Sequence, residues 1–227
     1  MTRRFTPCFD ILPPAQRRLW PELQNAPALG LTLYGGTAIA LRLGHRDSVD
    51  FDFFTEQALD HSAIKAAFPF VAGSTTRKEE PNTWVLSVPY ADSKHSVVQV
   101  AFLGLIGFGR VGEPELTEDG ILRVASLDDL MATKVKVILQ RAEAKDYRDI
   151  AAMIRAGVSL SRGLAAARLF FGPHFQPSES LKALVYFGDG DLDTLTITDR
   201  NTLVEAVSAV RDLPEITLRS RSLAGKT

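Results

Sequence analysis

Aspartate and phenylalanine alternate in the segment VDFDFF (residues 49–54), and this alternation constrains the fold more than any other feature of the sequence. Successive side chains of a β-strand point to opposite faces, so Asp50 and Asp52 share one face while Phe51 and Phe53 share the other. The phenylalanines can fill a core while the two carboxylates stand together in a cleft. Like charges this close repel each other, and a divalent metal would resolve the repulsion. The segment therefore predicts a half-buried strand that presents a pair of metal-binding carboxylates.

A glycine-rich turn precedes this strand. The residues LTLY (31–34) predict a short buried strand, Gly35-Gly36-Thr37 predicts a turn, and TAIALRLG predicts a helix that ends at Gly44. Glycines let a backbone approach a phosphate closely, and the start of a helix offers N–H groups and a positive dipole end. Mg²⁺ prefers carboxylate oxygens together with substrate phosphates. The arrangement favours a phosphoryl- or nucleotidyl-transfer site; the structural alternative is ordinary turn chemistry beside an exposed acidic face.

The predicted strands fall in the first half of the chain and the predicted helices in the second. The segments TWVLSVPY (83–90) and HSVVQVAFLG (95–104) predict a hairpin joined by the turn-like ADSK. Helices are expected over residues 15–23, 63–68, 127–142, 147–155, 160–171, 180–187 and 202–212. This order predicts an α+β fold, in which residues 1–125 form a small mixed β-sheet core flanked by helices and residues 126–227 form a helical C-terminal part. Ser126 can cap the first helix of that part.

The turn and the strand together resemble those of the nucleotidyltransferase superfamily, whose members share a glycine-rich turn and an Asp-x-Asp strand. The longer string GGTAIALRLGHRDSVDFDFF is similar to one branch, the AbiEii/AbiGii toxin family of type IV toxin–antitoxin systems. The matching residues are Gly35, Gly36, Thr37, Ala38, Arg46, Ser48, Asp50 and Asp52. The resemblance implies transfer of an NMP from an Mg²⁺-bound NTP. Asp50 and Asp52 would be the catalytic metal ligands; the glycine turn, Arg46 and Ser48 would lie at the nucleotide, or Ser48 would support the site through hydrogen bonds.

The resemblance extends to residues 129–154, where the family has a lysine, an arginine and a basic-Asp-x-x-Asp run. The matching residues are Lys134, Arg141, Lys145, Asp146 and Asp149. The family implies that Lys134 and Asp149 complete the active site, with Lys134 binding nucleotide phosphate as a point charge. Asp149 would orient Lys134, or support the acceptor hydroxyl or the metal.

The same residues also have an ordinary interpretation. In a solvated amphipathic helix Lys145 and Asp149 would form an i,i+4 pair, and we expect Asp146 to cap the start of a second helix. If these residues formed one continuous helix, Arg141, Lys145 and Asp149 would lie on one broad face with Lys134, because they follow it by seven, eleven and fifteen positions. A shift in register would exchange the role of Lys134 with that of Lys136.

One departure from the superfamily pattern bears on activity. Many nucleotidyltransferases carry a third carboxylate on a later strand, and here Gln99 and Ala101 occupy the expected positions. A single-metal site, a second metal held mostly by substrate, or Asp149 as the third acid would each preserve catalysis. Alternatively, the protein is a degenerate member that binds nucleotide or an antitoxin without turnover.

The segment GFGRVG (107–112) matches a dinucleotide-binding pattern, but such a pattern must open a helix. Glu113-Pro114 follows, so we expect a loop that borders the nucleotide cleft, with Arg110 as a phosphate contact. Other basic residues near the motif, Arg42 and His45, together with arginines at both ends of the chain, are candidates for an RNA-binding surface. Acidic residues interleave with them throughout, which favours the alternative of a scattered solvated surface.

Composition restricts the partners. The net charge of −1 provides no global basic field, and Cys8 is the only cysteine, which fits a reducing cytoplasm. No apolar run approaches the roughly 18 residues of a spanning helix, so we expect no membrane anchor. The family implies an RNA acceptor, such as a tRNA 3′ end, and a cognate antitoxin. A small-molecule acceptor of the aminoglycoside type is the alternative among enzymes.

Overall fold

The computed structural model describes residues 3–89 and 97–225, and the chain forms two compact units. The first unit is Met1–Gly109, Glu113–Ala125 and Ser220–Thr227, and the second is Arg110–Gly112 and Ser126–Arg219. The main division falls between Ala125 and Ser126, and the described residues 220–225 group with the first unit.

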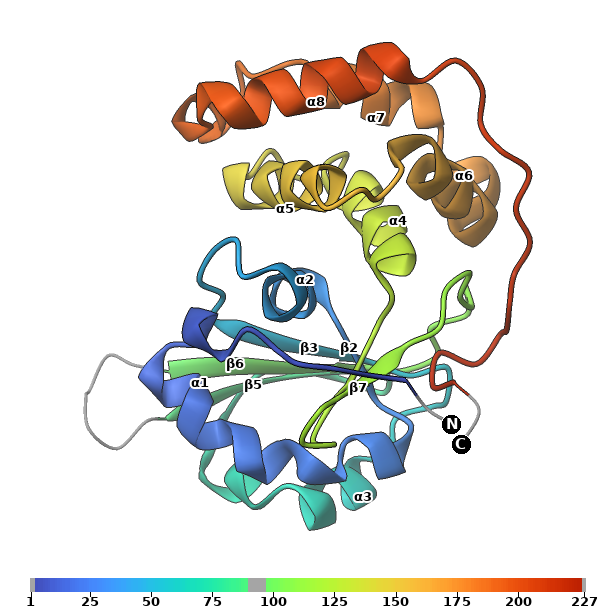
Figure 1. Ribbon diagram of the computed structural model, residues 1–227. Coiled ribbons are helices and arrows are strands. Elements are labelled where there is room, and N and C mark those ends of the chain that lie inside the picture. Colours follow the sequence, from blue (N-terminus) through green and yellow to red (C-terminus); the bar gives the residue numbers. More distant parts are fainter. Residues whose placement is uncertain (1–2, 90–96, 226–227) are drawn as a thin grey trace. The chain divides into compact units, whose positions relative to one another are not determined.

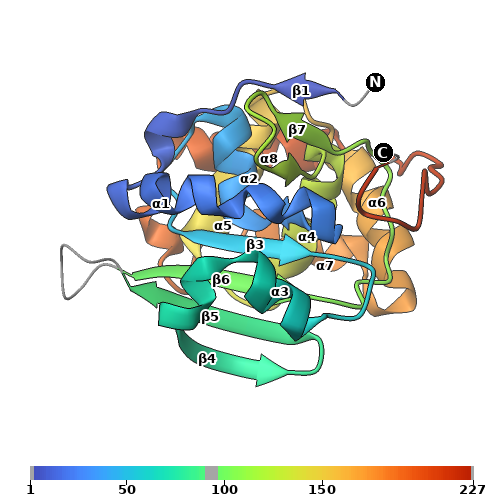
Figure 2. The same cartoon turned by 90° about the horizontal axis from the view of Figure 1, so that it is seen from below.

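The first unit is built on a mixed β-sheet. Its strands are β1 (Arg4–Phe5), β2 (Thr32–Tyr34), β3 (Asp50–Phe54), β4 (Thr75–Glu80), β5 (Thr83–Pro89), β6 (Val97–Leu103), β7 (Glu115–Thr117) and β8 (Arg123–Val124). Across the sheet, the order of the described strands is β1-β7-β8-β2-β3-β6-β5-β4 (Figures 1 and 2). β3 is central: it pairs antiparallel with β2 and parallel with β6.

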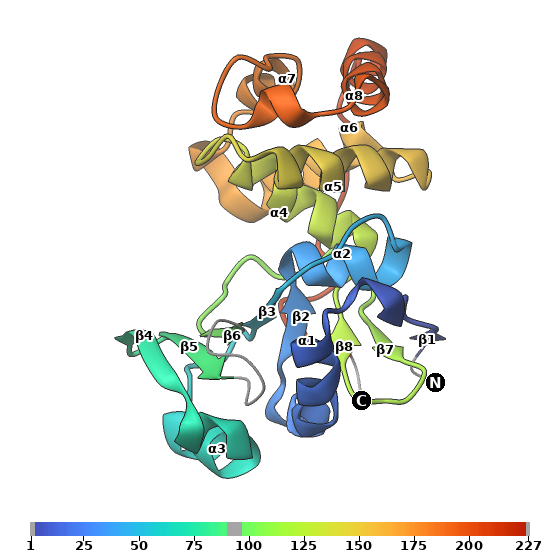
Figure 3. The ribbon, with the colours of Figure 1, turned by 90° about the vertical axis from the view of Figure 1, so that its left-hand side faces the viewer.

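The described part of the first unit contains three α-helices: α1 (Pro14–Leu19), α2 (Gly35–Leu43) and α3 (His61–Ala67). Short 3-10 helices accompany them: η1 (Phe9–Ile11), η2 (Trp20–Asn25), η3 (Pro27–Leu29) and η4 (Pro69–Gly73). α1 and α3 cover one face of the sheet, and α2 lies on the other (Figure 3). The sheet therefore has one face closed by two helical segments and another that α2 shares with the predicted catalytic carboxylates.

Aromatic side chains explain why α1 and α3 lie on their face. The Phe53 and Phe102 rings stack with centroids 5.6 Å apart. Phe68, which ends α3, lies 5.5 Å from Phe102, and Trp20 of η2 lies 6.3 Å from Phe51. Burial of this many large apolar groups stabilises the unit and fixes the register of β3, because a one-residue slip would turn its phenylalanines to the opposite face.

The second unit is helical. Its elements are α4 (Leu127–Val137), α5 (Ala144–Arg155), α6 (Leu160–Phe171), η5 (Gly172–His174), α7 (Pro177–Leu184), η6 (Leu192–Thr194) and α8 (Ile197–Ala209). Ser126 caps α4 as predicted: its hydroxyl oxygen accepts a hydrogen bond from the Asp129 N–H at 3.1 Å and donates to the Asp129 carboxylate at 2.6 Å. α4 and α6 pack closely, since a Cβ on Gly163 would overlap Met131.

The α+β class is confirmed, and so is the antiparallel pairing of β5 with β6. The ADSK turn between them lies outside the described residues. The sequence did not predict β4, whose six residues TTRKEE are all exposed at the sheet edge. No helix in the described part of the chain is long and apolar enough to cross a membrane.

Candidate active site

The glycines predicted as a turn form the first turn of α2, which follows β2 directly. Gly35 is the first residue of α2 and has a φ of +74°, a left-handed conformation that side-chain-bearing residues rarely adopt. A Cβ placed there would overlap the Asp52 carboxylate and would lie 3.2 Å from its Cγ. The structure thus shows a close approach of the Asp52 side chain to this glycine, while the phosphate contact expected from the sequence stays a prediction.

The two aspartates of β3 lie on one face. Asp50 and Asp52 are half-buried, while Phe51 and Phe53 are fully buried on the other face, so the alternation predicted from the sequence is present. Tyr34, the last residue of β2, pairs with Asp52 across the ladder. The strand therefore places both carboxylates on the α2 side of the sheet, beside the glycine turn.

Two buried hydroxyl groups connect α2 to the start of β3. The Thr37 hydroxyl donates to the backbone carbonyl of Asp50, and it lies 2.7 Å from the Ser48 hydroxyl. Since the single Thr37 proton is used on the carbonyl, the Ser48 hydroxyl donates to Thr37. Both side chains are buried, at 1% and 7% exposure. This chain of hydrogen bonds fixes the backbone at Asp50, which favours a supporting function for both residues.

The neighbouring strand supplies no third acid. In the parallel ladder between β3 and β6, Asp50 pairs with Gln99 and Asp52 pairs with Ala101. These are the two positions that the sequence singled out as departing from the superfamily. Within the described residues there is also no group of three or more aspartate, glutamate, histidine or cysteine side chains placed to hold a metal.

An aromatic group beside Asp52 was not predicted. The rings of Tyr34 and Phe54 stack with centroids 4.7 Å apart, and Phe108 meets them edge-on at 6.0 and 6.3 Å. Phe54 follows Asp52 by two residues, so it shares the face of the aspartates. That spacing was a sequence signal from which the position of Phe54 could have been predicted. Nothing in the sequence indicated that Phe108, from a distant loop, would join the group.

The basic residues near the motif have structural partners. Arg42 donates to the carbonyls of Ala125 and Val124 at 2.9 and 3.0 Å and forms an ion pair with Glu115 at 2.6 Å. It therefore joins α2 to the strands at one side of the sheet. Arg46 is half-buried and donates to the Asp47 carbonyl at 2.8 Å.

The GFGRVG segment is a loop, as expected, because no helix follows it. The guanidinium of Arg110 is buried at 3% exposure and donates to the Gly112 carbonyl at 2.8 Å. This bond holds the loop that begins the second unit, so a phosphate contact is not needed to explain why an arginine stands there.

A buried ion cluster occupies the second unit. Lys134 Nζ lies 2.5 Å from Asp146 Oδ1 and 2.7 Å from Asp149 Oδ2, and Arg141 Nε lies 2.8 Å from Asp146 Oδ2. Lys134 is 5% exposed and both aspartates are fully buried. Burial by itself would raise the pKa of Asp146, but Lys134 and Arg141 together hold it below its ordinary value. The cluster joins α4 to the start of α5.

The structure corrects three details of the sequence interpretation. Asp146 is not a cap: α5 begins at Ala144, and both Asp146 oxygens are bound by Lys134 and Arg141. The helix is not continuous, since α4 ends at Val137. The Lys145–Asp149 pair of the amphipathic-helix interpretation is absent, because Asp149 lies on Lys134 and Lys145 pairs with Glu143 at 2.8 Å.

Lys134, and not Lys136, is therefore the lysine that meets the aspartates. The Lys136 ammonium donates to the His174 carbonyl at 3.0 Å. Two residues along an α-helix turn the side chain by roughly 200°, so the two lysines leave α4 on nearly opposite sides.

The ion cluster gives the stability of the second unit a defined pH dependence. The ordinary pKa of Asp146 is 3.8 and its folded pKa is lower. Its ionised form therefore stabilises the fold above pH 3.8, and this contribution is lost as the pH falls through the folded value. We expect hydrogen-exchange protection in α4 and α5 to fall below this pH and to depend less on pH in Asp146→Asn. Equal acid sensitivity in wild type and variant would contradict this assignment.

A second prediction concerns Gly35. We expect Gly35→Ala to destabilise the first unit by about 1–3 kcal/mol, because the left-handed backbone and the overlap with Asp52 both oppose a side chain. Gly73 is the matched control, since a Cβ there would meet nothing within 4 Å and its φ is not left-handed. Urea denaturation of Gly35→Ala and Gly73→Ala checks this. If both variants lose the same free energy of unfolding, the close approach of Asp52 to Gly35 has no effect on stability.

The sheet order, the glycine turn and the paired carboxylates define a protein with a nucleotidyltransferase-type fold. MenT4, a nucleotidyltransferase toxin from Mycobacterium tuberculosis H37Rv, has a similar fold, with a TM-score of 0.52 at 15% sequence identity over 84% of this chain and 82% of that chain.

The family described as "Nucleotidyl transferase AbiEii toxin, Type IV TA system" matches residues 18–214, and the chain belongs to this family. The resemblance inferred from the turn and the strand is thereby confirmed. An uncharacterized protein of Aquifex aeolicus (strain VF5) is 28% identical over 139 residues, which are 59% of this chain. The match covers 64% of the length of that relative.

Proposed function

We propose that the protein is a nucleotidyltransferase that moves an NMP from an NTP to an acceptor hydroxyl. One observation carries the proposal: Asp50 and Asp52 project from the same face of β3, and the Gly35 turn closes onto Asp52. Membership of the AbiEii family and the fold shared with a nucleotidyltransferase toxin support the same activity.

The residues present fit a divalent cation such as Mg²⁺. Asp50 and Asp52 offer carboxylate oxygens, the donors that Mg²⁺ prefers, and phosphates of the substrate would complete the coordination. Mg²⁺ bound there would offset the charge on the transferred α-phosphoryl group.

The protein's own residues would bind and orient the reactants. The first N–H groups of α2, from Gly35 to Thr37, have no partner within the helix by geometry and can bind a phosphate. Thr37 and Ser48 hold the backbone at Asp50, so its carboxylate keeps its orientation. The acceptor oxygen then forms a bond to the α-phosphorus in line with the bond that breaks, pyrophosphate leaves, and the hydroxyl proton is released.

Two further residues are proposed to bind nucleotide. Arg46 reaches from the segment before β3 with a half-buried guanidinium. Lys134 would act as a point charge for phosphate, with Asp149 and Asp146 fixing its ammonium. Comparison of the KM for NTP with kcat in Arg46→Met checks the first assignment, because loss of a phosphate contact raises KM, whereas loss of fold lowers the active fraction.

The acceptor we propose is RNA, a tRNA 3′ end in particular, modified in the cytoplasm by a toxin that a cognate antitoxin restrains. The family description as a type IV toxin supports this choice. Gln99 and Ala101 beside the two aspartates favour a second candidate, a member that binds nucleotide or antitoxin without turnover. An acceptor of the aminoglycoside type has no specific support among the described residues.

Induced expression tests the proposal in cells. We expect growth arrest together with 3′-extended tRNA in total RNA, and neither effect with Asp52→Asn. Arrest without RNA extension would overturn the RNA acceptor. Extension that persists in the variant would overturn the assignment of the site.

A further inference from the structure

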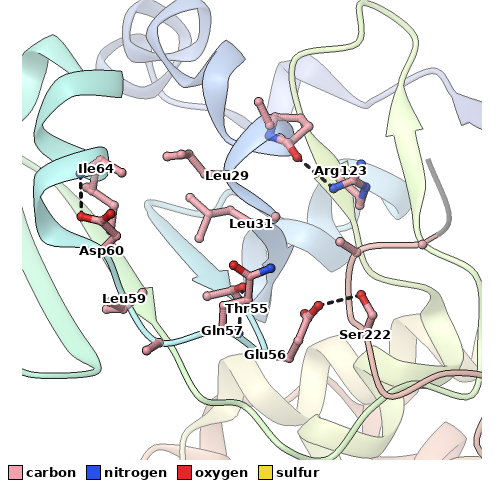
Figure 4. Close-up of a pocket in the computed structure, with 17 residues that line it drawn as sticks. Leu29, Leu31, Thr55, Glu56, Gln57, Leu59, Asp60, Ile64, Arg123 and Ser222 are labelled. Carbon is pink, nitrogen blue, oxygen red and sulfur yellow. Dashed lines mark hydrogen bonds between the residues drawn. The ribbon is translucent and has the colours of Figure 1, made fainter.

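A cavity of about 470 Å³ lies in the first unit, within the size range of small-molecule sites (Figure 4). Its walls come from residues 27–31, residues 55–60, the start of α3, Arg123, and the C-terminal residues Ser222, Ala224 and Gly225. The residues 55–60 follow β3, and Gly30 and Leu31 precede β2. The cavity therefore lies at the opposite end of these strands from the glycine turn, with Thr55 roughly 10 Å along the chain from Asp52.

A buried guanidinium forms one wall of this cavity. Arg123 is 7% exposed, and one of its Nη groups donates to the Pro27 carbonyl at 3.2 Å (Figure 4). Within the described residues, no carboxylate lies within ion-pair distance of it, and Pro27 supplies its one hydrogen-bond acceptor. Burial lowers the pKa of Arg123, while the charge of Glu56 raises it. A buried cation that binds a carbonyl but no carboxylate creates a favourable position for an anion.

Glu56, the nearest acid, is occupied by the C-terminal segment. Its two oxygens accept hydrogen bonds from the Ser222 hydroxyl at 2.7 Å and from the Leu223 N–H at 3.1 Å. Leu223 is buried at 1% exposure, which anchors this segment as a wall of the cavity. The Glu56 carboxylate therefore holds the C-terminal segment in place and forms no direct ion pair with Arg123.

Several apolar side chains line the cavity away from Arg123. Leu29, Leu31, Leu59 and Ile64 line the cavity, and Leu31 and Ile64 are only 2% and 3% exposed. Asp60, also in the wall, accepts the Ala63 N–H at 2.9 Å and so caps α3. The cavity thus has one cationic end, and its remaining lining combines these apolar side chains with the polar Thr55 and Gln57.

We propose that this cavity binds a small monocarboxylate with an apolar body, its carboxylate on Arg123 and its body against Leu29, Leu31 and Ile64. A guanidinium pairs with a carboxylate through two parallel hydrogen bonds. Glu56 lies close enough to influence Arg123, so it opposes a doubly charged phosphate more than a single carboxylate. The site is separate from the proposed transfer site and does not depend on that function.

NMR titration of the full chain with phenylacetate, phenylacetamide and inorganic phosphate tests this proposal. We expect phenylacetate to shift the amide signals of residues 28–31 and 55–60. The uncharged phenylacetamide should bind about tenfold more weakly or worse, because it lacks the charge-assisted hydrogen bonds. Arg123→Met should lose the preference for the carboxylate, whereas Arg77→Met, an exposed arginine on β4, should retain it.

A second variant separates binding from folding. Ala63→Leu keeps Arg123 and fills part of the cavity, so we expect it to fold and to lose phenylacetate binding. Equal affinity for phenylacetate and phenylacetamide would overturn the function of Arg123, and stronger binding of phosphate would overturn the carboxylate class. If none of the three probes shifts the cavity signals of the wild type, the site itself is refuted.

Discussion

We expect Asp50→Asn and Asp52→Asn each to reduce nucleotidyl transfer by about 10³-fold or more while the protein stays folded. Both side chains are half-buried on the same face of β3, and an amide of the same shape can fill that space. It cannot supply the negative charge that a divalent cation needs. Losing several kcal/mol of transition-state stabilisation corresponds to a rate decrease of about this size.

The measurement is transfer of label from an α-labelled NTP to RNA, with circular dichroism to verify the fold. Asp47→Asn is the matched control, since Asp47 lies three residues before Asp50 and is exposed. The control should retain the wild-type rate. If all three variants retain it, the paired carboxylates are not the catalytic ones.

The largest stability effect is expected from Lys134→Met. Removal of the lysine takes away the ammonium that lies 2.5 Å from Asp146 and 2.7 Å from Asp149, and both of these carboxylates are fully buried. Breaking a buried ion pair from one side typically destabilises a protein by about 3–5 kcal/mol. We expect a loss of this size in the second unit, seen as lower hydrogen-exchange protection of α4 and α5.

Lys136→Met serves as its control. Lys136 lies on the same helix and is also a lysine, but its ammonium donates to the exposed His174 carbonyl and lies 6.0 Å from the centre of the Phe171 ring, with no ion pair among the described residues. We expect its replacement to change stability by less than about 1 kcal/mol. Similar losses in the two variants would show that the buried cluster contributes no more than an ordinary surface lysine.

Local patterns in the sequence predicted the central part of the first unit well. The alternation in VDFDFF identified β3 and its two faces, and Gly44 marked the end of α2, whereas the helix begins at Gly35, two residues before the predicted start at Thr37. Gly44 ends α2 in a left-handed conformation, as expected of a helix C-terminus. These features depend on neighbouring residues, so a single sequence contains them.

Features that depend on distant residues were not predicted. The strand TTRKEE (β4) has no apolar face, and pairing with β5 alone makes it a strand. Asp146 occupies a position typical of a capping residue. Its carboxylate instead accepts hydrogen bonds from Lys134 and Arg141, which precede the start of α5. The Arg123 cavity needs the last residues of the chain beside Glu56, more than 160 positions away.

The central claim is that Asp50 and Asp52 form the metal and nucleotide site with the Gly35 turn. A crystal of the protein soaked with Mn²⁺ and a non-hydrolysable NTP analogue tests it most directly through the anomalous signal of the metal. We predict a manganese peak bound by both carboxylates, with the analogue's phosphates at residues 35–37. Manganese and phosphates bound elsewhere, with neither aspartate in contact with the metal, would contradict the account.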